Sequence, residues 1–154
     1  MKLIAFSLAL GAVVAFGLML LWPDTTARPD MRVEVANLEQ GKTLYAENCA
    51  SCHGASLKGE ENWRQPGPDG ILPAPPHDAT GHTWHHDDAM LFDYTKHGGQ
   101  ALMQARGMTD FQSGMPGFGE ALSDREIRDI LAYIKSSWPA KIRRAQTERS
   151  GQGG

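Results

Sequence analysis

One short segment constrains the fold more than any other, because Cys49-Ala50-Ser51-Cys52-His53 holds the only two cysteines in the chain. Two thiols separated by two residues and followed by a histidine form the pattern by which c-type haem is attached. Each thiol can form a thioether to one vinyl side of the porphyrin, and the adjacent imidazole can then ligate the iron. The segment therefore predicts one covalent haem held by Cys49, Cys52 and His53.

Other uses of a C-x-x-C pair fit this chain less well. A thioredoxin-like redox pair belongs beside a βαβ pattern, and no strand is predicted ahead of Cys49. A closed zinc site needs four ligands, so Cys49, Cys52 and His53 would have to recruit a remote histidine. A structural disulfide would leave His53 without a role.

The N-terminal segment predicts export. Residues 3–22 carry no charge after Lys2 and as a helix would be about 30 Å long, enough to cross a bilayer. We expect residues 1–22 to be an uncleaved signal-anchor with Trp22 at the interface. A cleaved signal peptide ending near Thr25-Thr26-Ala27 is the alternative. Both place the remaining chain outside the cytoplasm, and the anchor would hold the haem domain at the periplasmic side of the membrane.

Length and charge limit the rest of the chain. The 154 residues have room for one domain, predicted over 37–138 after a polar linker at 23–36. Residues 139–154 are expected to form a partly disordered tail. Without Lys2 the chain has 14 Lys and Arg against 18 Asp and Glu, a net charge of −4. This balance argues against nucleic acid as a partner and permits docking to a basic protein face.

Apolar spacing and capping residues predict three helices and no strands, hence an all-α fold. Asn37, with Gln40 three residues later, is a capping-box pattern that opens a helix leading to the haem segment. Ser123 and Glu126 form a second such pattern before a helix that ends ahead of Pro139. Its apolar positions follow helical spacing: Ile127, Ile130, Leu131 and Ile134.

The middle of the chain combines one helix with a long loop. Asp88 is expected to cap a helix that ends at His97, with Gly98 as the residue after it. Between His53 and Asp88 the chain is rich in Gly, Pro and His and is predicted to be a loop. A haem makes so long a loop acceptable, because the ring supplies an apolar surface for the loop to cover.

The second axial ligand of the iron is predicted to be Met115. It lies in Ser113-Gly114-Met115-Pro116-Gly117-Phe118-Gly119, whose glycines and proline keep the backbone out of a helix and allow close approach to a planar group. An ordinary turn methionine is the alternative interpretation. Met103 and Met108, expected in a weakly patterned loop, are the substitutes, and Met90 is expected to pack inside the middle helix.

Histidines gather after the haem segment. His82 with His85 or His86, assisted by His77 or Asp87, has the donor types that bind copper or zinc. The alternative is a polar loop that covers the haem propionates, with Trp63 or Trp84 against the ring. His97, in the last turn of its helix, is expected to be a favourable charge near the helix C-terminus.

These motifs, in this order over about residues 37–138, resemble class I cytochrome c, and more closely its bacterial membrane-anchored monohaem type. The resemblance implies close contact between the first and last helices. The matching residues are Gly41 and Tyr45 on the first, and Ile130 and Tyr133 on the last. It also implies a proline whose carbonyl accepts the N–H of the proximal imidazole. Pro75 is the predicted one, with Pro66, Pro68 and Pro73 left open.

The expected function is electron transfer rather than enzymatic catalysis. A histidine–thioether pair raises the haem potential, and two filled axial positions leave little room for substrate. Electrons would pass through the haem edge near Cys49 and Cys52 during brief docking. The resemblance implies respiratory partners such as quinol–cytochrome c reductase and a terminal oxidase or reductase. A haem subunit of a larger oxidoreductase, and a haem or copper-handling protein using the histidine-rich loop, are the alternatives.

Overall fold

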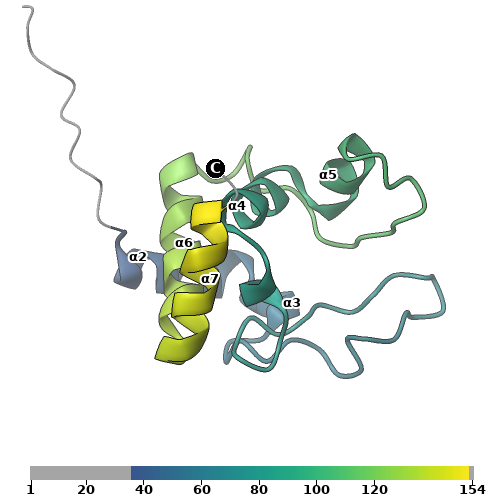
Figure 1. Cartoon of the computed structure of the whole chain (residues 1–154). Coiled ribbons are helices and arrows are strands. Elements are labelled where there is room, and N and C mark those ends of the chain that lie inside the picture. The colour runs from purple at the N-terminus through teal and green to yellow at the C-terminus, as the bar shows by residue number, and fades with distance from the viewer. Residues whose placement is uncertain (1–35, 153–154) are drawn as a thin grey trace, which may run out of the picture. The chain divides into compact units, whose positions relative to one another are not determined.

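The computed structural model describes residues 36–152, and the predicted anchor at 1–22 lies outside this range. Within it no helix is long and apolar enough to cross a membrane. The secondary structure of the described residues consists of helices joined by loops, with no strand, as predicted (Figure 1). The elements are α2 (Leu38–Asn48), α3 (Ala50–His53), the 3₁₀ turn η1 (Thr83–His85), α4 (Asp88–His97), α5 (Gly99–Ala105), α6 (Asp124–Ser136) and α7 (Ala140–Gln152).

The domain is built on the contact between α2 and α6. Gly41 makes this contact possible, because a Cβ atom there would lie 2.0 Å from the backbone oxygen of Asp129 on α6. One turn later Tyr45 is buried, with its ring centroid 5.5 Å from that of Tyr133. Ile130, also on α6, is buried in the same cluster. The close contact that the resemblance implied is therefore present, and it fixes the end of α2 from which the haem segment continues.

A buried carboxylate connects the two helices at the start of α2. Asn37 caps α2 as predicted, its side chain accepting a hydrogen bond from the backbone N–H of Gln40. The backbone N–H of Asn37, however, donates to Oδ1 of Asp129, 2.7 Å away. Asp129 is only 1% exposed, and its other oxygen accepts from Nε of Arg125 at 3.2 Å. A residue of α6 thus supplies the bond that a Gln40 side chain would make in a complete capping box.

Removing this carboxylate should destabilise the domain. We expect Asp129→Ala to lower the free energy of unfolding by about 2–3 kcal/mol, because the backbone N–H of Asn37 loses a charged acceptor and Arg125 loses a buried partner. Urea unfolding of the holoprotein would measure the loss. Asp110→Ala, at an exposed position, is the matched control and should change stability by less than about 0.5 kcal/mol. Equal stabilities of the two variants would contradict the assignment.

The capping box of α6 and the bounds of α4 agree closely with those predicted from the sequence. Ser123 and Glu126 make both reciprocal hydrogen bonds of the box. The middle helix spans Asp88–His97, but its cap is Asp87, whose side chain accepts from the N–H of Met90 at 2.7 Å. Gly98 ends the helix with a φ of 83°. The predicted helix is confirmed, and the cap lies one residue earlier than expected.

Besides the short α3 and the turn η1, two helices were not predicted. The first is α5, which follows the reversal at Gly98 and buries Leu102 and Met103. Met103 was expected in a loop but is only 4% exposed inside this helix. At seven residues, α5 is too short for a clear helical period. Its buried positions are set by packing rather than by a local signal.

The second is α7, which corrects the expectation of a partly disordered tail over 139–154. Residues Ala140–Gln152 form a helix (Figure 1). Gln146 is fully buried and donates through Nε2 to Oδ1 of Asp88 at 2.6 Å and to Oγ of Ser150 at 3.0 Å. Pro139 directly precedes the helix, and a proline with its fixed φ is well tolerated where a helix begins. Because α7 is held by the polar side chain of Gln146 and has no apolar stripe, apolar spacing in the sequence did not predict this helix.

Candidate functional site

The thiol pair sits where α2 passes into α3. The backbone N–H of Cys49 donates to the carbonyl of Tyr45 at 2.9 Å, and the carbonyl of Cys49 accepts from the N–H of His53 at 2.9 Å. Both cysteines are free thiols, Cys49 buried and Cys52 exposed. Burial, with a smaller effect of Cys52, raises the pKa of Cys49 to about 11. Cys49 is therefore protonated at neutral pH, unlike the low-pKa thiols of redox-active pairs.

His53 is held by the carbonyl that was predicted for it. Its side chain is 7% exposed, and Nδ1 lies 2.8 Å from the carbonyl oxygen of Pro75. A carbonyl only accepts, so Nδ1 carries the proton and Nε2 keeps a free lone pair. Burial lowers the pKa of His53, which favours the neutral ring. This tautomer and this partner are those of a histidine prepared to bind a metal through Nε2.

The histidine-rich loop does not bring together the donors of the copper or zinc site that was considered for it. Among residues 36–152 no group of three or more His, Cys, Asp or Glu side chains is placed to hold a metal ion. The imidazoles are engaged with other rings instead. His82 stacks on Trp63 with ring centroids 5.4 Å apart, and His85 lies 3.7 Å from the ring of Trp84. His77 stacks on His53, a neighbour that the sequence did not reveal.

The Met115 loop is fixed at its backbone against the end of α4. Met115 is half-buried, its N–H donates to Oγ of Ser113 at 3.2 Å, and its carbonyl accepts from the N–H of Gly99 at 3.1 Å. A Cβ atom on Gly98 would lie 2.6 Å from the backbone nitrogen of Gly117. The glycines thus permit close approach of this loop to the α4–α5 junction. From the sequence they had been expected to permit close approach to a planar group.

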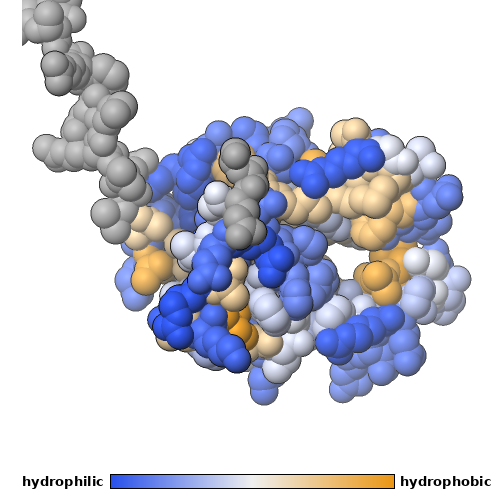
Figure 2. All heavy atoms as spheres, viewed as in Figure 1, coloured by the Kyte–Doolittle hydropathy of each residue, from blue (hydrophilic) through white to orange (hydrophobic). Residues whose placement is uncertain are grey.

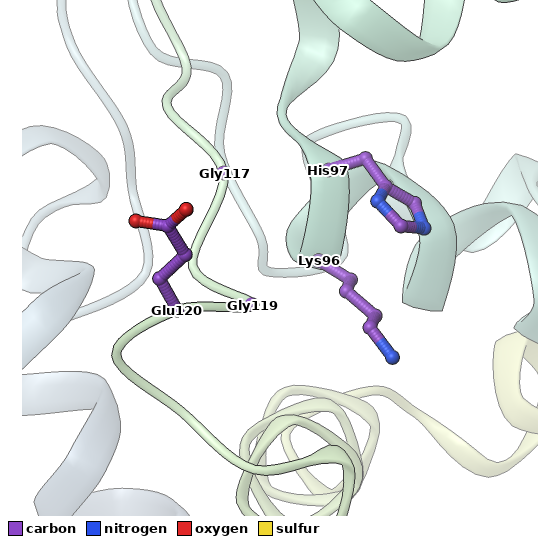
Figure 3. A pocket seen from close by; sticks show the side chains of 5 residues that line it. All are labelled: Lys96, His97, Gly117, Gly119 and Glu120. Carbon is purple, nitrogen blue, oxygen red and sulfur yellow. The ribbon is translucent and has the colours of Figure 1, made fainter.

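A separate cavity of about 400 Å³ opens beside this loop, lined by Lys96, His97, Gly117, Gly119 and Glu120. Figure 3 shows Glu120 on the opposite side of the loop from Lys96 and His97, whose side chains point away from it. Lys96 is paired with Asp124, 2.6 Å away. The lining includes no thiol and not His53, so this cavity is not the site that the sequence predicts.

The residues present fit a covalent haem. Two unpaired thiols and an imidazole with a free Nε2 lie within five consecutive residues, which is the donor set that haem attachment requires. Figure 2 shows the surface hollowed between the part that carries α5 and the loop that follows α3, with apolar residues on the α5 side. An open hollow with one apolar side suits a large flat cofactor.

An all-helical domain with this donor set defines a c-type haem protein. The cytochrome c family model matches residues 38–138, which is 101 of the 154 residues, and the chain therefore belongs to the cytochrome c family, in its class I form. Its cofactor is haem c, covalently attached, and its function is haem-based electron transfer. No curated protein and no solved structure gave a significant match.

Proposed function

We propose that the protein is a membrane-tethered monohaem electron carrier whose iron is held between His53 and Met115. The observation that supports His53 as an iron ligand is the 2.8 Å contact between its Nδ1 and the carbonyl of Pro75. It leaves Nε2 as the only ring nitrogen able to bind iron. As for the other ligand, Met115 is half-buried, and both its N–H and its carbonyl are hydrogen-bonded.

A haem closed on both faces suits outer-sphere transfer of single electrons. The bound haem supplies the Fe(III)/Fe(II) couple, and a neutral thioether opposite an imidazole favours the ferrous state. His53 and Met115, each held by hydrogen bonds to its surroundings, would bind the iron, and a site closed in this way would reorganise little. Cys52 is exposed at the surface, so the haem edge attached there is the proposed exit for electrons.

The proposed setting is the outer face of a membrane. Residues 1–22 are long and apolar enough to serve as an anchor, with the haem domain on the periplasmic side. A tether keeps the domain at high effective concentration beside membrane-bound redox proteins. The proposed partners are a quinol–cytochrome c reductase as donor and a terminal oxidase or reductase as acceptor, each in brief contact.

Met115→Ala tests the ligand assignment. We expect the oxidised holoprotein to lose the weak near-infrared sulfur-to-iron band, and the reduced protein to bind CO, because the sixth position opens. Its reduction potential should fall. Met108→Ala, at a residue 46% exposed, and Met103→Leu, which keeps its buried volume, are the controls and should retain the band. If a control lost the band and Met115→Ala kept it, the methionine replaced in that control would be assigned as the ligand instead.

The tether is tested by the mass and partition of the purified chain. An intact mass that includes residues 1–22 and one haem, with the protein retained in alkali-washed membranes, is the expected result. Replacing residues 1–22 with a cleavable signal peptide should release the same haem spectrum into the soluble fraction. A wild-type product that begins after Ala27 and is freely soluble would contradict the anchor.

A further inference from the structure

The two rings His53 and His77 lie face against face inside the domain. Their centroids are 3.9 Å apart and their planes differ by 26°. The edge of His53 is bound to the carbonyl of Pro75, two residues before His77. One short segment, Pro75-Pro76-His77, therefore contacts both the edge and the face of the same imidazole. The two prolines restrict its backbone, because their rings fix φ.

His77 is itself held from several sides. Its backbone N–H donates to the carbonyl of Leu57 at 2.8 Å, and its carbonyl accepts from Nε1 of Trp138 at 2.7 Å. Its Nδ1 lies 2.9 Å from Oγ1 of Thr83. Trp138 follows α6 and is 1% exposed, and Thr83 is buried at the start of η1. The backbone of His77 is thus anchored to Leu57 and Trp138, far from it in sequence, and its ring is bonded to Thr83.

The hydroxyl of Thr83 selects the orientation of the His77 ring. Thr83 donates its single hydroxyl hydrogen to the carbonyl of Pro76, at 3.4 Å. The same hydroxyl is hydrogen-bonded to Nδ1 of His77, at 2.9 Å. This bond stops rotation of the His77 ring about its side-chain axis. The face that His77 presents to His53 is therefore fixed.

Two constraints act on His53 in different ways. The bond to Pro75 fixes Nδ1 of His53 but leaves the ring free to swing about that bond. A flat ring 3.9 Å from its face blocks the swing. We propose that His77 is a positioning residue that sets the plane of the His53 imidazole, and through it the electronic structure and potential of the haem iron. This inference rests on the proposed ligation of iron by His53.

The plane of a ligating imidazole matters because it decides which iron orbitals the ring overlaps. Partners that orient a metal ligand commonly change affinity or activity by 10–100-fold when they are removed. We expect a change of about tenfold in the equilibrium constant for haem reduction, which is about 59 mV for a one-electron couple. The g-values of the oxidised haem should change with it.

The test compares three variants as holoproteins by electron paramagnetic resonance and redox titration. His77→Leu removes the flat face, and Thr83→Val leaves the face but removes the bond that fixes it. We expect altered g-values and a shifted potential in both, the shift being larger for His77→Leu. His77→Phe keeps a flat ring but, like Thr83→Val, loses the bond to Thr83, so its g-values should lie between those of wild type and His77→Leu. Thr83→Val conserves volume, so it serves if His77→Leu fails to mature.

Wild-type g-values and potential in both Thr83→Val and His77→Leu would overturn the proposal, even if both variants are less stable. Thr83→Val alone decides in the same way if His77→Leu yields no holoprotein. A His77→Phe variant that resembles His77→Leu would also overturn it, because the flat ring would then be irrelevant. The near-infrared band of the wild-type protein tests the axial ligation separately. Its absence would refute the Met115 assignment while leaving the comparison of g-values intact.

Discussion

Replacing both Cys49 and Cys52 with serine is expected to yield a chain with no covalently attached haem. These are the only thiols in the sequence, and both are free in the structure. A serine hydroxyl does not form the thioether, so the chain should have the mass of its amino acids alone. The domain should also be much less stable, since the haem forms part of its core. Intact mass and haem staining after denaturing electrophoresis measure the loss.

Single variants divide the effect between the two thiols. Cys52→Ser, at the exposed thiol, leaves Cys49 to make one thioether, so we expect haem that remains bound after denaturation but in lower yield. Ser51→Ala, at the exposed residue between them, is the matched control and should carry haem at the wild-type level. A double variant that still held haem through acid-acetone extraction would refute attachment at these residues.

The helices that the sequence predicted are those with local signals at their ends. The capping box of Ser123 and Glu126 and the stop at Gly98 need only neighbouring residues, and both are present in the structure. Even so, the exact cap of α4 was missed by one residue, because Asp87 and Asp88 are equally good caps by type. Local chemistry predicts that a helix begins, and tertiary contacts select the residue.

The elements that sequence analysis missed depend on distant partners. Gln146 anchors α7 by a hydrogen bond to Asp88, which also forms a salt bridge with Lys135 at 2.7 Å. A polar contact of this kind leaves no periodic pattern in the sequence. In the same way, Asp129 completes the cap of α2 from 92 residues away. Both are polar side chains buried by pairing, which apolar spacing does not detect.

The site was predictable in its chemistry more than in its surroundings. The C-x-x-C-H pattern identified the thiols, and the resemblance pointed to Pro75, whose carbonyl lies 2.8 Å from Nδ1 of His53. The metal site considered as one use of the histidine-rich loop is absent from the described residues, because donor types in sequence do not show which rings stack. His77 had been considered as a metal ligand, whereas the structure places it against His53.

Gly41→Ala is expected to destabilise the domain strongly although it adds only one methyl group. The new Cβ would lie 2.0 Å from the carbonyl oxygen and 2.5 Å from the carbonyl carbon of Asp129. Both atoms are backbone, so no side-chain rotation relieves the overlap and α2 must move away from α6. Overpacking typically costs about 1–3 kcal/mol and occasionally more. With backbone on both sides, we expect a loss of about 3 kcal/mol or more in the free energy of unfolding.

The same substitution elsewhere provides the control for helix propensity. Gly151 lies in α7, and a Cβ atom there would have no neighbour within 4 Å, so Gly151→Ala adds a methyl group without a contact. It should raise stability by up to about 1 kcal/mol, because alanine favours a helix. Urea unfolding of both holoproteins measures the difference. If Gly41→Ala were as stable as Gly151→Ala, α2 and α6 could separate at no cost, and their contact would not be what positions the haem segment.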